Sequence, residues 1–187
     1  MSPEIIPYQP EWPRRFAALA EPLRRALGDL ALRIDHIGST AVPGLAAKDV
    51  IDIQITVPAL DPRLITVLQG LGYLWRSEIT CDHHPPGVSG EDADWEKWYF
   101  TSPPGLPAVH LHVRVHGRAN QRYPLLFRDY LRAHPATAAA YAELKRRLAR
   151  HLADPEMYSE VKDPAVDLIY LAAEEWAAVI GWQPADS

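Results

Sequence analysis

The stretch His36–Val57, HIGSTAVPGLAAKDVIDIQITV, decides how the rest of this chain is interpreted, because a loop of small residues leads within it into a strand that carries a carboxylate. Over residues 50–57 apolar side chains alternate with polar ones, and Asp52 is among the polar set. Successive side chains of a strand point to opposite faces, so one face is predicted to be apolar and the other polar. Before the strand, Gly38 and Ser39 are small enough for backbone N–H groups to approach an anion closely. The stretch therefore predicts a turn beside a carboxylate on a well-anchored strand.

The same alternation recurs at residues 108–115, where His110, His112 and Arg114 alternate with apolar residues. Two strands of this kind predict a sheet with one face covered by helices and the other presenting polar groups to a cleft. Further strands are predicted at residues 30–37, 72–75 and 95–101.

Apolar residues at helical spacing predict helices before, between and after these strands. They are predicted at residues 13–27 and 61–71, on both sides of Pro135, and from about Pro155 onward with a restart at Asp163-Pro164. The predicted fold class is therefore α+β: a mixed, mainly antiparallel sheet packed by helices on one face, with a C-terminal helical segment. The 187 residues fit one domain, with 1–117 as the αβ core and 118–187 as the helical segment packing on it.

Composition excludes several classes of function. The net charge of −5 argues against a general nucleic-acid binder, which needs a concentrated basic surface. The single cysteine, Cys81, excludes an intramolecular disulfide and is typical of a reducing cytosol. The sequence has neither a long apolar run nor a signal-peptide pattern, so we expect a cytoplasmic protein without a membrane partner. Its oligomeric state is left open.

The stretch His36–Val57 also resembles a known family. Gly38-Ser39 followed by a strand with acidic residues resembles the active-site signature of the DNA-polymerase-beta-like nucleotidyltransferase superfamily. More closely, HIGSTAVPGLAAKDVIDI resembles the GrpB-like family, as do KWYF, VHLHV, FRDYLRAHP and YAELK further along. The resemblance runs from about Pro7 to Lys162. It implies a sheet of nucleotidyltransferase type and a cleft for a nucleotide or a phosphorylated small molecule.

Three residues are the candidates for catalysis and for binding a divalent metal: Asp52, His110 and His112. Metals held by carboxylates commonly neutralise charge in phosphoryl and nucleotidyl transfer. The resemblance implies that the strand bearing the histidines neighbours Asp52. Magnesium or manganese would suit such a reaction, but imidazole ligands also suit zinc or nickel. The alternatives are a structural carboxylate and a histidine pair hydrogen-bonded at a solvated sheet face.

A second group of residues is predicted to bind the substrate or its phosphates, because they combine a small-residue turn with cations. They are Gly38, Ser39, Lys48, Lys97, Arg114, Arg128 and Lys145. Arg128 and Lys145 enter this group through the resemblance. The run Cys81-Asp82-His83-His84 has zinc-ligand types, but its residues are contiguous, and residues 81–94 are predicted to form an exposed loop instead.

Three functions remain open. The first is a transferase that moves a nucleotidyl group to a small acceptor. The second is a ligand-binding module that has lost the reaction, since Gln54 stands where the superfamily pattern places a second carboxylate. The third is a metal-dependent phosphoester hydrolase that uses the histidines and Asp52.

Overall fold

The computed structural model describes residues 3–88 and 90–185, and its centre is a sheet in the order β1-β2-β5-β4-β3. The strands are β1 (Arg33–Ile37), β2 (Val50–Val57), β3 (Leu74–Trp75), β4 (Trp98–Thr101) and β5 (Ala108–Val115). Strands β2 and β5 run parallel, whereas the other three pairs of neighbours run antiparallel. The predicted α+β class with a mixed, mainly antiparallel sheet is confirmed.

The helices are α1 (Trp12–Leu27), α2 (Arg63–Gly70), α3 (Ala119–Ala133), α4 (Pro135–His151) and α5 (Tyr158–Ile180). Short 3-10 segments lie at Gly28–Leu30, Ser39–Ala41, Asp92–Trp95 and Pro155–Met157. The predicted restart at Asp163-Pro164 is wrong, because α5 continues through Pro164. Proline removes the N–H that would bond the carbonyl of Glu160, but Glu160 is exposed, so water can satisfy that carbonyl.

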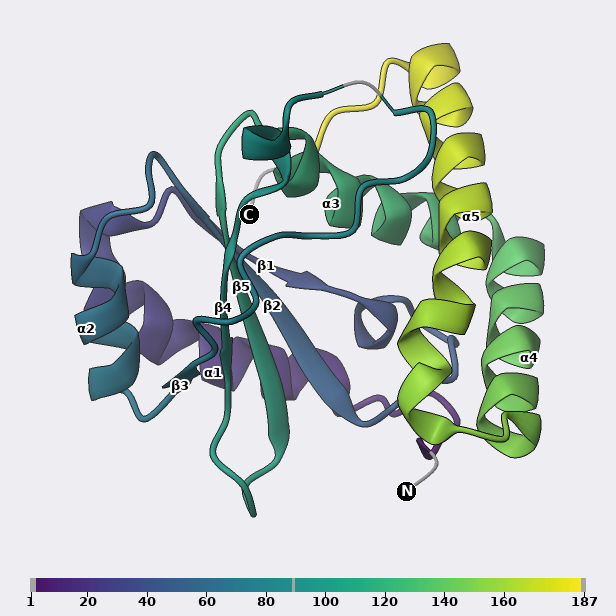
Figure 1. Cartoon of the computed structure of the whole chain (residues 1–187), viewed down its shortest axis with the longest axis horizontal. Coiled ribbons are helices and arrows are strands. Elements are labelled where there is room, and N and C mark those ends of the chain that lie inside the picture. Colours follow the sequence, from purple (N-terminus) through teal and green to yellow (C-terminus); the bar gives the residue numbers. More distant parts are fainter. Residues whose placement is uncertain (1–2, 89, 186–187) are drawn as a thin grey trace.

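Two groups of helices pack on the sheet and are separated in Figure 1, where α1 and α2 lie on one side and α3, α4 and α5 on the other. The apolar face of β2 packs with the first group, in one core that includes Trp12, Leu23, Leu64, Ile51 and Ile53. This arrangement follows from the alternation in β2, because its odd-numbered side chains all point to the same face.

The second core lies among α3, α4, α5 and the segment before β2. Phe127, Tyr141 and Tyr170 pack there with Val42 and Leu45. The predicted C-terminal helical segment therefore forms a second wall opposite the polar side of the sheet. Within the described residues, no helix is long and apolar enough to cross a membrane.

Candidate functional site

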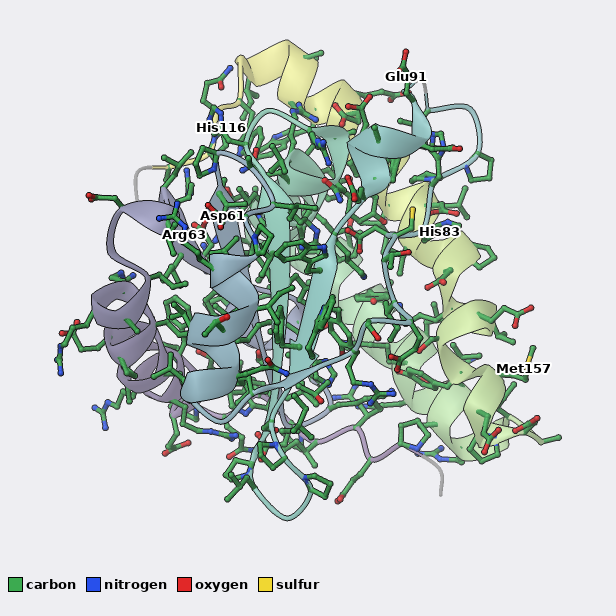
Figure 2. The ribbon with its side chains drawn as sticks, turned by 60° about the vertical axis from the view of Figure 1, so that its left-hand side comes forward. Asp61, Arg63, His83, Glu91, His116 and Met157 are labelled. Carbon is green, nitrogen blue, oxygen red and sulfur yellow. The ribbon has the colours of Figure 1, made fainter. Side chains whose placement is uncertain are left out.

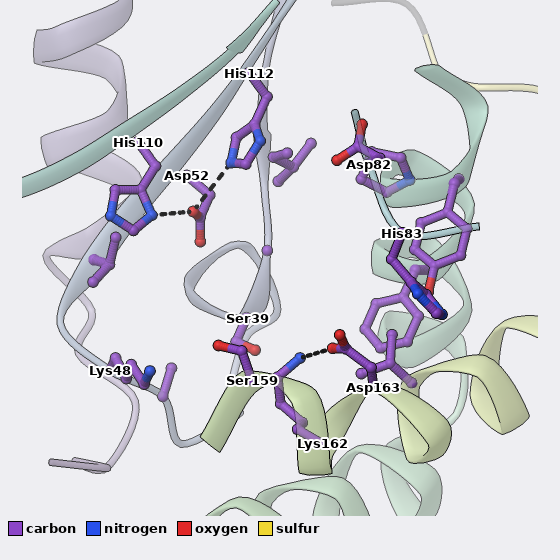
Figure 3. A pocket seen from close by; sticks show the side chains of 18 of the residues that line it. Ser39, Lys48, Asp52, Asp82, His83, His110, His112, Ser159, Lys162 and Asp163 are labelled. Carbon is purple, nitrogen blue, oxygen red and sulfur yellow. Dashed lines mark hydrogen bonds and ion pairs between the residues drawn. The ribbon is translucent and has the colours of Figure 1, made fainter. Parts of the chain in front are cut away.

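The parallel pairing of β2 with β5 brings the three predicted metal ligands together. Asp52 pairs with His110 in the strand register, and His112 follows two residues later on the same face. Oδ1 of Asp52 lies 3.2 Å from Nδ1 of His110 and 3.5 Å from Nε2 of His112. One ligand atom from each residue lies within 4.8 Å of the other two. Both imidazoles are directed toward the carboxylate (Figure 3), so the arrangement can hold a metal ion.

A cavity of about 510 Å³ lies beside this cluster, within the range of small-ligand sites. The sheet supplies Asp52 and the two histidines to its lining. The loop after β1 supplies Ser39, and α4 and α5 supply Lys145 and Lys162. The polar face of the sheet thus borders a cavity, as the alternation in the two strands predicted, and the C-terminal helices form its other side.

The protonation states of two cluster residues suit metal binding. Burial alone would raise the pKa of Asp52, but hydrogen bonds from His110 and His112 outweigh burial and hold that pKa below its ordinary value. Burial, assisted by the positive charge of Arg114, lowers the pKa of His112 to about 4. At neutral pH the carboxylate is therefore ionised and the His112 ring is neutral, which are the forms that bind metals.

One contact of His112 opposes metal binding at its Nε2. Nη2 of Arg114 lies 3.3 Å from Nδ1 of His112, and a guanidinium can only donate. Nδ1 is therefore the acceptor, and the single proton of the neutral ring lies on Nε2, facing Asp52. A metal bound at Nε2 would require this proton to move to Nδ1 and Arg114 to release the ring.

Gly38 explains why the turn before Ser39 needs a residue without a side chain. Its φ is +70°, and a Cβ placed there would lie 2.4 Å from Oδ2 of Asp52. The backbone of the turn therefore packs directly against the carboxylate, and a side chain at this position would displace it.

The opposite wall of the cavity carries three lysines. Nζ of Lys145 donates to Oγ of Ser39 at 2.9 Å, and Nζ of Lys48 lies 4.1 Å from the centre of the Tyr158 ring. Lys162 lies 3.3 Å from a carboxylate oxygen of its neighbour Asp163 (Figure 3). Burial lowers the pKa of Lys145 to about 7, and the nearby cation Lys162 adds to the effect.

Two other predicted phosphate-binding residues line the cavity, but they share one carboxylate as a partner. Asp82 accepts from Nζ of Lys97 at 2.6 Å and from Nε of Arg114 at 2.7 Å. Asn120 also donates to Asp82, at 3.2 Å. Lys97 and Arg114 therefore share one carboxylate in a buried ion-pair network, which balances half of their combined charge before any ligand binds.

Arg128 is not among the residues that line the cavity. It is buried, donates to the backbone carbonyl of His36 at 3.0 Å and to Asp129 at 2.7 Å, and thereby fixes α3 against β1. The phosphate-binding role predicted for it lacks a geometric basis here, because these contacts direct its guanidinium to other partners.

Asp82 is the residue that sequence reasoning missed. Residues 81–94 were expected to form an exposed loop, yet the Asp82 side chain is only 17% exposed and lies at the cavity. The neighbouring His83 faces α5 (Figure 2) and lies 3.0 Å from both carboxylate oxygens of Asp167. The available signal was indirect: two cations on the polar face of neighbouring strands, Lys97 and Arg114, need a carboxylate partner if they are buried.

The contiguous run from Cys81 to His84 does not gather into a metal site. Cys81 is exposed, and the ring of His84 stacks on Trp95 with ring centres 4.6 Å apart. Within residues 3–88 and 90–185, the cluster of three potential ligands is the one at Asp52.

Gln54 is fully buried and does not occupy a ligand position. It accepts from Nη1 of Arg114 at 2.8 Å and donates to the carbonyl of Gln121 in α3, also at 2.8 Å. Although Gln54 shares a strand face with Asp52, α3 covers it. A two-carboxylate metal site on β2 is therefore absent from the described structure.

Comparison with known proteins agrees with this architecture. The model of the family described as GrpB protein matches residues 2–171. The crystal structure of a conserved GrpB protein from Enterococcus faecalis superposes with a TM-score of 0.74 and 31% identity, covering 92% of this chain and 99% of that one.

Relatives in sequence carry two kinds of name. A UPF0157 protein of Pseudomonas aeruginosa is 43% identical over 173 residues, covering 87% of this chain and 64% of the relative. A protein of Mycolicibacterium paratuberculosis named dephospho-CoA kinase is 39% identical over 196 residues, covering 96% of this chain and 48% of the relative. The chain thus spans about half the length of relatives that bear the kinase name. With the family match over most of its residues, this chain belongs to the GrpB family.

Proposed function

We propose that this protein binds a nucleoside triphosphate in its cavity together with a divalent metal ion and transfers the nucleotidyl group to a small acceptor. One observation carries the proposal: a cluster of metal-ligand types, Asp52, His110 and His112, lines the same cavity as an amine-rich wall. Nucleotidyl transfer needs charge neutralisation and in-line positioning, and a metal and ammonium groups supply the first.

The charge balance of the cavity supports a phosphate-bearing ligand. Lys145 contacts a hydroxyl and Lys48 an aromatic ring, and within the described residues neither forms an ion pair. A partly buried ammonium such as that of Lys48 is unfavourable without a counterion, and a phosphate would supply one. Some relatives are named kinases, and a phosphate-bearing ligand agrees with that name.

The ligand types favour a transition metal over magnesium. Magnesium prefers an octahedral shell of oxygen ligands, whereas one carboxylate and two imidazoles suit manganese, zinc or nickel. We therefore expect manganese to support nucleotide binding better than magnesium does.

The test crosses the four common ribonucleoside triphosphates with manganese, magnesium, zinc and nickel in a thermal-shift panel, because a ligand specific to the folded state raises the melting temperature. At least one triphosphate should raise it only when a metal is present, and Asp52→Asn should abolish that increase. Asp61→Asn is the matched control, since Asp61 pairs with Arg63 at the surface beside α2 (Figure 2). If no triphosphate raises the melting temperature at millimolar concentration, the proposal fails.

A second candidate function is a binding module of the same fold without transfer. The buried Gln54, hydrogen-bonded through both its amide oxygen and its amide nitrogen, favours it, because a two-metal clamp is difficult to build from one carboxylate. The two candidates differ in turnover. Pyrophosphate release in the presence of a pool of small hydroxyl and amine acceptors supports transfer, and metal-dependent binding without release supports the module.

A further inference from the structure

Ser39 and Lys145 form a close pair at the wall of the cavity. Ser39 opens the 3-10 segment after β1, and Lys145 lies on α4, so 106 residues separate them in sequence. Their Nζ and Oγ atoms are 2.9 Å apart, and Lys145 is only 4% exposed. Nζ also lies 4.6 Å from the centre of the Tyr141 ring, which covers it with apolar surface. The amine is thus held against one hydroxyl.

We propose that Ser39 is a nucleophile with Lys145 as its general base, and that the nucleotidyl group passes through a covalent adduct on Ser39 before it reaches the small acceptor. This inference rests on the proposed function, because it assigns a nucleotide to the cavity. It goes further by giving Ser39 a bond-forming role in place of a phosphate contact.

The step balances without another reactant. The neutral amine of Lys145 takes the hydroxyl proton of Ser39 as Oγ attacks the α-phosphorus. The bond from that phosphorus to the bridging oxygen breaks, and pyrophosphate leaves with the bonding electron pair. The product is a phosphodiester between Ser39 and the nucleoside, with the proton on Lys145. An acceptor hydroxyl then attacks the same phosphorus and the bond from phosphorus to Oγ breaks. Ser39 takes back the proton held by Lys145, and the proton of the acceptor hydroxyl is released to solvent.

The surroundings of Lys145 suit a base. The cations Lys162, Arg146 and Lys48 disfavour its charged form, and Asp52 opposes them with a smaller effect than the first two. With burial as the largest cause, its pKa falls to about 7, so the neutral amine is well populated at physiological pH.

Lys97, which also lines the cavity, differs from Lys145 because it has a carboxylate partner. Lys97 is also buried, and burial lowers its pKa, but the carboxylate of Asp82 lies 2.6 Å from its Nζ, opposes that effect and favours the ammonium form. A serine is activated in lysine-dependent enzymes when the lysine lies within hydrogen-bond distance of it and is not held by a carboxylate.

The position of Ser39 relative to the metal ligands also fits. The residue before it, Gly38, packs against the carboxylate of Asp52. A phosphate bound to a metal at Asp52 would therefore lie next to the turn that presents Ser39. No rearrangement of the backbone is needed to bring the hydroxyl to the cavity, since Ser39 already lines it.

The first experiment incubates the protein with α-³²P-labelled triphosphate and manganese, followed by denaturing gels and peptide mass spectrometry. The wild-type protein should retain label on Ser39, and Ser39→Ala should lose it. Lys145→Arg keeps a cation for phosphate but removes the base, so it should keep the thermal shift and form the adduct at least about 100-fold more slowly. Ser159→Ala is the matched control, because Ser159 also lines the cavity (Figure 3) and should not be required.

The second experiment needs neither metal nor nucleotide. A fluorophosphonate probe should label Ser39 at a rate that rises with pH around a midpoint near 7, and Lys145→Arg should abolish this dependence. Metal-dependent binding without label on Ser39 from either reagent overturns this inference and leaves the proposed function intact. Probe labelling of Ser39 with that midpoint, but without any nucleotide binding, supports Ser39 and Lys145 as nucleophile and base, but overturns the proposed function and with it the nucleotidyl adduct.

Discussion

Replacing Lys145 by methionine should stabilise the folded protein, and the gain should shrink as the pH rises. The fold lowers the pKa of Lys145 from 10.5 to about 7. Each unit corresponds to about 1.4 kcal/mol, so at pH 6, where both states are protonated, the lysine disfavours folding by about 4–5 kcal/mol. Between pH 7 and 10.5 the folded state binds fewer protons than the unfolded one, and stability rises with pH. At pH 9 the penalty is about 2 kcal/mol.

Urea unfolding followed by tryptophan fluorescence measures this difference. At pH 6 the free energy of unfolding of Lys145→Met should exceed that of the wild-type protein by several kcal/mol. At pH 9 this excess should be smaller by about 3 kcal/mol. Arg147→Met is the matched control, because Arg147 lies exposed on the same helix and pairs only at the surface with Glu143, so its removal should change the free energy of unfolding by less than about 1 kcal/mol at both pH values. A pH-independent difference, or a less stable Lys145→Met at pH 6, would refute the reasoning.

Two further substitutions test the site. Gly38→Ala would place Cβ 2.4 Å from the carboxylate of Asp52 and should weaken manganese binding by about 10-fold or more in calorimetry. Gly44→Ala, whose φ is +80° and whose Cβ would meet nothing within 4 Å, bears a similar backbone strain and should bind normally. Asp82→Asn should lower the free energy of unfolding by about 3–5 kcal/mol at pH 7, because it leaves Arg114 without its buried carboxylate. Burial raises the pKa of Asp82, but Arg114 and Lys97 together outweigh burial and hold that pKa below its ordinary value. The stability that the Asp82 carboxylate contributes is therefore present above about pH 4 and lost in acid, where the free energies of unfolding of the two proteins should become similar.

The strands at the centre of the fold were predictable because their side chains alternate over eight residues. The predicted bounds of β5, 108–115, agree with the structure, and those of β1 began three residues early because Gly28–Leu30 forms a 3-10 turn. Alternation gave the face of Asp52 and of the histidines, but not which strands are neighbours. The family resemblance implied that the strand with the histidines neighbours the strand with Asp52, and the structure shows this as the pairing of β2 with β5.

The partners of the cations were harder to predict. Arg128 and Lys145 both lie on helices after the sheet, yet the first is bonded to the carbonyl of His36 and the second faces the cavity. Helical periodicity identifies a buried face without saying what lies opposite it. Asp82 was missed for a related reason, since local turn signals describe its loop whereas its role depends on the distant Arg114.

The parallel pairing of β2 with β5 joins Asp52 to a histidine 58 residues away along the chain. A fragment that ends before β5 has one of the three ligand side chains and lacks both histidines of the cluster. An ion that requires all three ligand side chains can therefore bind only after β2 has paired with β5. A bound ion would then indicate that this part of the sheet has formed.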